Sequence, residues 1–253
     1  MMPLLAIEGL NKRFGGLQVV KDVSLSVSAG EALAIIGPNG AGKTTFFNLL
    51  TGILPPTSGQ IRFKGADISR TAIDERARLG IARTMQITSV FPDLSVADNV
   101  LIAVMRPASA WAAYGLTSRH AAAMRGQAHE FLTLVGLQHH ASTRCGDLAY
   151  GDQRLVEIAV ALGSRPELLL LDEPTAGLSP RESATVTAQL RKIHAQTGLA
   201  LIVVEHDMSV VAQLAQRVAV FHLGSCIIDD QTETVMRHPL VRDVYLGTDH
   251  AQA

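Results

Sequence analysis

The segment with the sequence GPNGAGKTT, residues 37–45, constrains the fold of this chain more than any other. It directly follows the apolar run ALAII at residues 32–36, so the two together predict a buried β-strand, a glycine-rich loop and then a helix. Gly37, Gly40 and Gly42 allow the backbone to turn tightly and to direct its N–H groups into a concave site for phosphate oxygens. The start of the helix adds the positive end of its dipole behind such phosphates.

Side chains of the same loop complete a predicted phosphate site. Lys43 would place a positive charge at the β- and γ-phosphates, and the Thr44 hydroxyl would be a ligand of Mg²⁺. The alternative is an ordinary glycine-rich turn with a solvated lysine, but the flanking strand and helix and a downstream pair of acids argue against it. We therefore expect the chain to bind a nucleoside triphosphate. The loop residues predicted to contact it are Gly37, Pro38, Asn39, Gly40, Ala41, Gly42, Lys43, Thr44 and Thr45.

The composition restricts the class of protein. At 253 residues the chain can bury a full hydrophobic core, and its net charge of −1 gives no general attraction to nucleic acid, so no nucleic-acid partner is expected. Cys145 and Cys226 are the only cysteines, which indicates neither a disulfide framework nor a zinc site. The opening MMPLLAIEGL does not fit a signal peptide, and no uncharged apolar run reaches the ~18 residues of a membrane span. A cytoplasmic location is therefore expected.

The two ends of the chain predict an α/β fold. The first sixty or so residues have β character, with polar and apolar side chains alternating at 23–28 as in a half-buried strand. After Pro166 the chain alternates between the apolar strands LLLLDE and LALIVVEH and helices, the first of which begins near Pro180, and it is expected to end in more helix. That alternation implies a parallel sheet covered by helices.

A helical block at about 88–160 interrupts this α/β domain. Valines recur at helical spacing from the start of the block, and the alanine-rich residues 119–135 predict a second helix. The segment 100–116 has two interpretations. It is either a partner-binding surface that presents Trp111 and Tyr114, or a core-facing helix followed by a loop.

Two acids follow the apolar strand at residues 168–171. Ligands bind at the carboxyl edge of open α/β sheets, so Asp172 and Glu173 would reach the phosphates there. We expect Asp172 to hold Mg²⁺ directly or through water, and Glu173 to polarise the attacking water. His206 follows a second apolar strand, so it would lie at the same edge and could hydrogen-bond the γ-phosphate or its attacking water.

Two further residues are open to either a functional or a structural interpretation. Gln86 lies between the strand-like IARTM and a loop, where it would contact Mg²⁺ or water and sense the γ-phosphate, or simply be a surface glutamine. Phe14 precedes two glycines and would stack on a nucleobase, or belong to the core.

The order of these motifs resembles the ATP-binding subunit of an ABC transporter over essentially the whole chain. That order is Phe14, GPNGAGKTT, Gln86, LAYGDQR at residues 148–154, LLLLDEP and then His206. The resemblance implies an α/β P-loop core with a parallel sheet, an N-terminal antiparallel β part and an inserted helical subdomain. The implied divisions of this single domain, 1–253, are a core of residues 1–87 and 161–253 and a helical subdomain of residues 88–160.

The same resemblance implies roles for individual residues. Two such subunits would enclose two ATP molecules, each between the phosphate loop of one subunit and the signature segment, residues 148–152, of the other. Phe14 would stack on the adenine, Glu173 would be the catalytic base and His206 the switch histidine. The implied metal ligands are Thr44, Asp172 and Gln86, and Gln86 also has an implied catalytic role. Tyr150 and Gly151 are the implied contacts to the ATP of the opposing subunit.

Finer motifs narrow the resemblance to one group of importers. IARTMQ, FPDLSVADNVLIA, VVEHDM and the closing HPLVRDVYLG are similar to the ATPases of branched-chain amino acid importers. The implied partners are a second ATPase subunit of the same or a sister chain, two transmembrane permeases and, indirectly, a periplasmic solute-binding protein. The subunit would then lie on the cytoplasmic face of the cell membrane. The alternatives are a lipopolysaccharide-export ATPase and a soluble ABC ATPase that takes no part in transport.

The chain departs from the usual family pattern at two places. The signature segment is usually Leu-Ser-Gly-Gly-Gln, whereas Ala149, Tyr150 and Asp152 stand at its second, third and fifth positions here. Ala149 therefore has no hydroxyl to offer the opposing γ-phosphate. The loop after Glu173 usually carries an aspartate where Ser179 stands, which removes a contact across the dimer.

Overall fold

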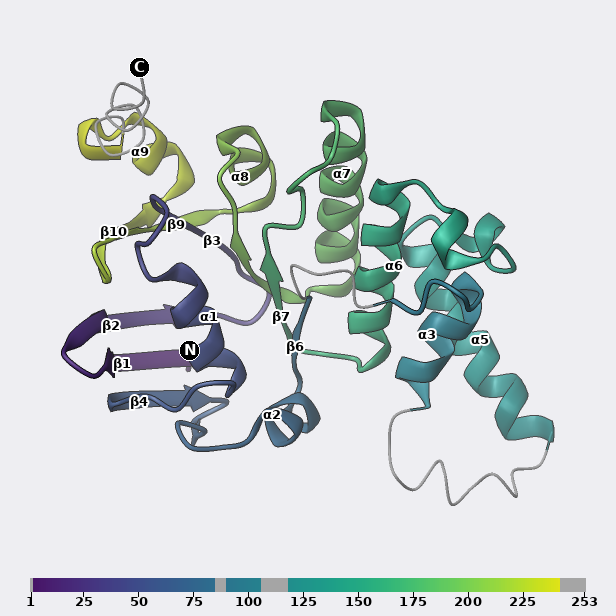
Figure 1. Cartoon of the computed structure of the whole chain (residues 1–253), viewed down its shortest axis with the longest axis horizontal. Helices are drawn as coiled ribbons and strands as arrows, with labels where there is room; N and C mark the ends of the chain where they lie inside the picture. Colours follow the sequence, from purple (N-terminus) through teal and green to yellow (C-terminus); the bar gives the residue numbers. More distant parts are fainter. Residues whose placement is uncertain (1, 85–89, 106–117, 242–253) are drawn as a thin grey trace.

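The computed structural model describes residues 2–84, 90–105 and 118–241, and these form two β-sheets with helices between and around them (Figure 1). The larger sheet has six strands in the order β10-β9-β3-β8-β7-β6, and every neighbouring pair is parallel except β10 with β9. The strands are β3 (Ala32–Ile36), β6 (Ile81–Arg83), β7 (Leu168–Asp172), β8 (Ala200–Val204), β9 (Arg217–His222) and β10 (Ser225–Gln231).

Strands β3, β7 and β8 are buried at every residue, which explains their uninterrupted apolar sequences. The second sheet is antiparallel, with the order β2-β1-β4-β5. It confirms the predicted N-terminal antiparallel part, although its second strand is longer than the alternation at 23–28 indicated. Its strands are β1 (Leu5–Phe14), β2 (Leu17–Val27), β4 (Ser58–Phe63) and β5 (Ala66–Asp67).

Helix α1 (Lys43–Thr51), which begins within the phosphate loop motif, lies between the two sheets (Figure 1). Phe46 and Phe47 are fully buried and belong to a hydrophobic cluster that also contains Leu10 of the antiparallel sheet and Ile35 of the parallel sheet. Consecutive residues of an α-helix point about 100° apart, so burial of both phenylalanines requires that the core cover a wide part of the helix surface. The helix that carries the loop is therefore held by the whole core.

The C-terminal end of α1 is capped by a buried arginine. Arg76, on α2 (Ile73–Leu79), is 1% exposed, and its Nη1 donates to the carbonyl oxygens of Leu49 and Leu50 at 2.6 and 2.8 Å. Burial lowers the pKa of Arg76 to about 10, which still leaves the guanidinium charged at neutral pH. A cation at this end of a helix is favourable because the last carbonyl groups carry partial negative charge.

The other face of the parallel sheet packs against a second hydrophobic cluster that reaches into the helical insertion. Val96 and Val100 are fully buried there, together with Leu169 and Leu171 of β7. The core-facing interpretation therefore holds for this part of the 100–116 segment, while Trp111 and Tyr114 lie outside the described residues. The helices and 3-10 turns are α3 (Val96–Val104), α5 (Ser118–Leu134), η2 (Gln138–His140), η3 (Cys145–Asp147), α6 (Tyr150–Gly163), α7 (Pro180–Thr197), α8 (Met208–Leu214) and α9 (Thr232–Arg237).

The structure differs from the sequence-based expectation after β8. More helix was expected there, but the short helix α8 is followed by the antiparallel hairpin β9–β10, and β9 also pairs in parallel with β3. The predicted boundary at 160 and 161 falls inside α6, which continues to Gly163. The boundary at 87 and 88 touches residues outside the described part of the chain. The division into core and insertion at these positions therefore stays a prediction.

Candidate nucleotide site

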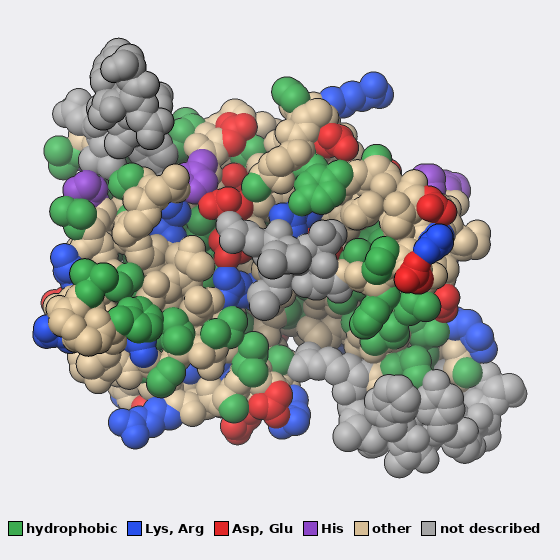
Figure 2. All heavy atoms as spheres, viewed as in Figure 1, with side chains coloured by type: hydrophobic (Ala, Val, Ile, Leu, Met, Phe, Trp, Pro, Cys, Tyr) green, Lys and Arg blue, Asp and Glu red, His purple; other side chains and the backbone are tan. Residues whose placement is uncertain are grey.

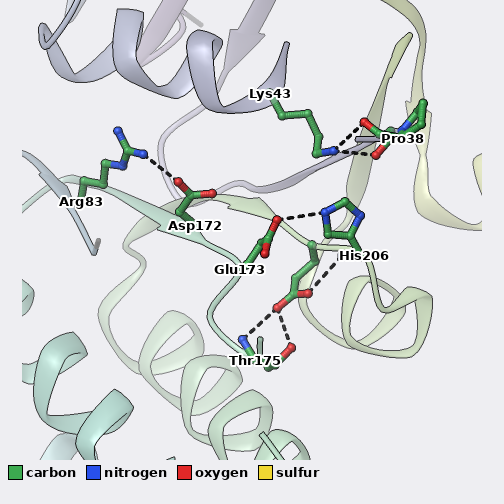
Figure 3. A network of polar contacts seen from close by, with 9 residues as sticks. Pro38, Lys43, Arg83, Asp172, Glu173, Thr175 and His206 are labelled. Atoms are coloured by element: carbon green, nitrogen blue, oxygen red, sulfur yellow. Dashed lines mark hydrogen bonds and ion pairs between the residues drawn. The ribbon is translucent and has the colours of Figure 1, made fainter. Parts of the chain in front are cut away.

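Three neighbouring strands bring the predicted site residues to one edge of the parallel sheet. β3, β8 and β7 are adjacent and parallel, so their carboxyl ends lie side by side. The loop that contains Pro38 follows β3, His206 follows β8, and Glu173 follows β7 (Figure 3). The predicted convergence of these segments is thus what the strand order produces.

The glycines of the phosphate loop have distinct reasons to be glycine. Gly37 has a φ of 153°, and a Cβ there would lie 2.2 Å from the Phe221 carbonyl oxygen. Gly42 has a φ of 96°, and its Cβ would lie 2.7 Å from the carbonyl oxygen of Val19. Gly40 has a φ of 79° but nothing within 4 Å of a Cβ, so the loop is open on that side. The first two fix the path of the loop against the core, while the third leaves space for a ligand.

Lys43 folds back over this loop. Its Nζ donates to the carbonyl oxygens of Gly37 and Pro38 at 2.6 and 3.0 Å (Figure 3). The side chain is 6% exposed. Burial lowers the pKa of Lys43 from its usual 10.5, and the nearby carboxylates of Glu173 and Asp172 partly oppose that shift. An ammonium group is therefore held inside the loop, and within the described part of the chain its hydrogen bonds go to neutral carbonyl groups, which suits an incoming anion.

The start of α1 has the features of an anion site. Its N-cap is Gly42, which makes no side-chain hydrogen bond to the helix, and no acidic residue lies in the first turn. The first backbone N–H groups of a helix need partners from outside it, and anions are favoured there. Among the predicted loop residues, Asn39, Gly40 and Thr44 are exposed at this end.

Asp172 is held by a residue that the sequence analysis did not single out. Its Oδ2 lies 2.7 Å from Nη2 of Arg83, and the two side chains are 3% and 10% exposed. Arg83 also donates from Nη1 to Oδ1 of Asn48 on α1 at 2.6 Å. One guanidinium thus joins β6, β7 and the helix of the phosphate loop. The only hint of this role in the sequence was that Arg83 lies three positions before the predicted site residue Gln86. Gln86 itself lies outside the described residues.

Glu173 and His206 contact each other directly. Nε2 of His206 lies 2.9 Å from Oε1 of Glu173, and the side chains are 38% and 24% exposed, respectively (Figure 3). Glu173 has a φ of 47°. An L-residue in this left-handed region costs of order 1–3 kcal/mol, and such strain concentrates at functional sites. The structure therefore brings together the two side chains that were predicted separately.

Phe14 is available for a planar ligand. It ends β1 with 46% of its surface exposed, so it is not the core aromatic of the structural interpretation. Nζ of Lys12 lies 5.1 Å from the centroid of its ring. One face of the ring can therefore be occupied by a cation while surface remains for stacking.

The signature segment begins helix α6. Ala149 is the N-cap and provides no side-chain hydrogen bond, while Tyr150 is 40% exposed. The N–H of Gly151 donates to Oε1 of Glu182 at 3.3 Å. Hydrogen bonds from the hydroxyl and N–H of Ser179, and then from Gly151, hold the pKa of Glu182 below its usual value. Ser179, the second departure from the family pattern, therefore caps α7 in this chain.

Comparison with known proteins agrees with this site. The family model described as ABC transporter matches residues 20–176, which include the phosphate loop, the signature segment and the two acids after β7. The chain belongs to the ABC transporter family. The match ends before His206 and begins after Phe14, so those two residues are placed by the structure alone.

Similar proteins cover almost the whole length of this ABC transporter chain. A high-affinity branched-chain amino acid transport ATP-binding protein, BraF from Pseudomonas aeruginosa, is 38% identical over 251 residues, 97% of this chain and 98% of BraF. The lipopolysaccharide export system ATP-binding protein LptB from Acidithiobacillus ferridurans is 33% identical over 249 residues, 98% of each. A solved ATP-binding cassette of an ABC transporter in its ADP conformation has a TM-score of 0.85, with 28% identity, and covers 98% of this chain and 100% of that one. The chain is thus an ATP-hydrolysing cassette of a transporter.

Proposed function

We propose that this cassette powers the import of branched-chain amino acids or related small solutes, with Glu173 and His206 at its catalytic centre. The observation that supports the centre is the 2.9 Å contact between these two side chains at the sheet edge that carries the phosphate loop. The similarity to BraF and the IARTMQ and VVEHDM segments support the solute class.

Hydrolysis would depend on positioning and charge. Transfer of a phosphoryl group to water needs stabilisation of charge more than covalent chemistry. Lys43 and the N–H groups of residues 37–45 would hold the β- and γ-phosphates, and Phe14 would stack on the adenine. The carboxylate of Glu173 would accept the proton of the attacking water. His206 would orient that carboxylate through the contact that the structure contains.

The residues present fit a magnesium ion. Mg²⁺ in such sites takes one or two oxygen ligands from protein and the rest from phosphates and water. The hydroxyl of Thr44 is exposed at the first turn of α1, and the Asp172 carboxylate ends β7 close enough to Lys43 to affect its pKa. Gln86 is the third ligand we propose. When bound, the metal would neutralise phosphate charge, while Arg83 would keep one oxygen of Asp172 in place.

The proposed site is complete only in a dimer. Tyr150 and Gly151 would approach the ATP held by the opposing subunit, which is either a second copy or a sister chain. ATP binding would close this dimer and hydrolysis would open it.

A groove on the surface supports docking to a membrane partner. It has a volume of about 340 Å³ and lies between α1, α2, β6, α3 and α6. Ile53 and Ile73 line it and are 41% and 51% exposed. We propose that each of the two ATPase subunits receives a segment of one permease in this groove. A periplasmic binding protein would deliver the solute to the two permeases.

The described helices include none long and apolar enough to cross a membrane. We therefore propose that the subunit is peripheral, held at the cytoplasmic face by the permeases. Basic and acidic side chains are interspersed on the face in Figure 2 and do not gather into one basic surface. The net charge of −1 likewise gives no general attraction to nucleic acid.

The catalytic assignment is tested by a pair of variants of the purified chain. Glu173→Gln keeps the shape of the side chain but cannot accept a proton, so ATP turnover should fall by roughly 10²–10⁴ while ATP binding remains. Lys43→Ala should instead weaken MgATP binding in calorimetry, because a buried cation facing the phosphates is lost. Normal turnover of Glu173→Gln would contradict the assignment.

The solute class is tested with the reconstituted transporter. Stimulation of ATPase activity by the binding protein loaded with a branched-chain amino acid would support the importer. Stimulation by lipopolysaccharide, or activity independent of any permease, would favour the lipopolysaccharide-export and non-transport alternatives.

A further inference from the structure

Glu205 is a buried carboxylate directly beside the proposed catalytic pair. It is 3% exposed and lies between the end of β8 and His206. Its Oε1 accepts hydrogen bonds from the N–H of Thr175 at 3.0 Å and from the Thr175 hydroxyl at 2.7 Å. Its Oε2 accepts from the N–H of His206 at 3.1 Å. The dashed lines to Thr175 and His206 in Figure 3 mark these contacts.

These contacts require that both side-chain oxygens of Glu205 accept hydrogen bonds. The three partners found for the Glu205 side chain are all donors, and a carboxylate is the side chain that accepts on both of its oxygens. Burial of a charge is costly unless hydrogen bonds replace its water, and charge-assisted bonds are about twice as strong as neutral ones. A serine or an apolar residue at this position would leave at least one of the three donors without a partner.

The two segments that Glu205 joins are the ones that carry the proposed catalytic groups. Thr175 is two residues beyond Glu173, and His206 is the next residue after Glu205. The N–H of Glu173 also donates to the Val204 carbonyl at 2.9 Å, so β7 and β8 remain paired up to this point. Beyond the strand ends, the hydrogen bonds of the Glu205 carboxylate and the contact between Glu173 and His206 link the two loops.

We propose that Glu205 is a positioning residue that holds Glu173 and His206 at their working separation. The proposal rests on the catalytic roles assigned above to these two side chains. Loss of the carboxylate frees the loop after β7 from the loop after β8, and a misplacement of about 1 Å at a reacting group can reduce the rate by roughly 100-fold. The recorded contacts of Lys43 do not involve Glu205, so nucleotide affinity stays the same.

Substitutions at two positions, Glu205 and Thr175, separate this role from general stability. Glu205→Gln replaces one acceptor oxygen by an NH₂ group, which meets a donor in either orientation. Thr175→Val removes the hydroxyl but keeps the volume, while Thr175→Ser keeps the hydroxyl. Thr185→Val is the matched control, because its hydroxyl bonds only within α7, to the Arg181 carbonyl at 3.0 Å, on an exposed turn.

The experiment measures kcat, KM and MgATP affinity for the full-length variants. We expect kcat to fall by roughly 10- to 100-fold in Glu205→Gln and less in Thr175→Val, with KM and affinity changed less than about twofold. Thr175→Ser recovers most of the rate, and Thr185→Val behaves as the parent chain. The double variant Glu205→Gln/Thr175→Val should lose less kcat than the product of the two single fold-losses, because the two groups act through one contact.

Three results would overturn the proposal. They are an unchanged kcat in Glu205→Gln, a loss that falls on KM and affinity instead of kcat, or equal losses in Thr175→Ser and Thr175→Val. The threonine pair still decides the matter if Glu205→Gln does not fold. If the proposed function is wrong, Glu173→Gln retains normal turnover. If Glu173→Gln is slow but Glu205→Gln turns over normally, only the positioning role of Glu205 is rejected.

Discussion

Arg83 and Asp172 form an ion pair that water hardly reaches, with side chains 10% and 3% exposed. Such a pair contributes little net stability when it is intact, since both groups lose their hydration. Removal of one partner is different, because the other is left as an uncompensated buried charge at a cost of about 3–5 kcal/mol. The pair therefore fixes the position of Asp172, a proposed magnesium ligand, and it contributes more to the orientation of that side chain than to stability.

We predict that Arg83→Met lowers the free energy of unfolding by about 3–5 kcal/mol. Urea unfolding followed by circular dichroism measures it. The control is Arg78→Met, whose ion pair with Asp74 is 72% and 61% exposed and should be worth less than about 1 kcal/mol. Similar small losses in both variants would show that Asp172 needs no cation.

The strand, glycine-rich turn and helix of the phosphate loop could be predicted because they follow from local sequence, and the structure confirms them. The roles of lysine as a charge and of threonine as an oxygen ligand stay predictions. Arg83 could not be predicted. Its partner Asp172 is 89 positions away, and the contact exists only because β6 pairs with β7 in the sheet. The same holds for Glu205 and Thr175, whose contact depends on β7 lying beside β8.

Helix α6 begins without the side-chain cap that α3, α7 and α8 have. Ser95 accepts from the N–H of Asp98 at the start of α3, and Ser179 forms a complete capping box with Glu182 at the start of α7. Ala149 has the extended backbone of an N-cap, with φ −59° and ψ 152°, but no oxygen to offer. The altered signature therefore leaves the end of one helix less stable than its geometry allows.

Ala149→Ser should raise the free energy of unfolding by about 1 kcal/mol, because the new hydroxyl can accept from an N–H in the first turn of α6. Ala188→Ser, on an exposed site inside α7, should lower it by up to about 0.5 kcal/mol, since serine is a weaker helix former than alanine. The sign of the difference in urea midpoints checks the prediction. A loss in both variants would mean that the N-terminus of α6 has another partner.

Several predicted elements have uniform or periodic burial, although the largely buried β9 was missed. β7 and β8 are buried on both faces and read as apolar runs, and α7 begins with a serine cap and a proline at its first position. The hairpin of β9 and β10 was missed. β10 is an edge strand with mostly exposed, mixed residues, so its pairing with β9 is decided by the rest of the sheet and not by its own pattern.

In the proposed dimer, the whole molecule presents one half of each of two ATP sites. The phosphate loop and the proposed catalytic pair lie at the end of the parallel sheet, whereas the signature segment begins helix α6. Gly151 at that start donates to Glu182 at 3.3 Å, a long hydrogen bond that a phosphate oxygen could replace. A carboxylate of the same chain thus occupies the place that we assign to the opposing ATP. Closure of a dimer would exchange one anion for another.

From this exchange we predict that the missing hydroxyl at Ala149 weakens dimer formation with ATP. In a Glu173→Gln background, where hydrolysis does not consume the closed state, Ala149→Ser should add a hydrogen bond to the γ-phosphate worth about 1.5–3 kcal/mol. A dimer of the variant would contain two such contacts, together about 3–6 kcal/mol, which corresponds to a roughly 10²- to 10⁴-fold lower dimer Kd with ATP, measured by analytical ultracentrifugation. With ADP the Kd should not change, which separates this contact from the capping of α6. Ala149→Val, which fills the space without a hydroxyl, should not tighten the dimer; equal tightening by both substitutions would assign the effect to packing.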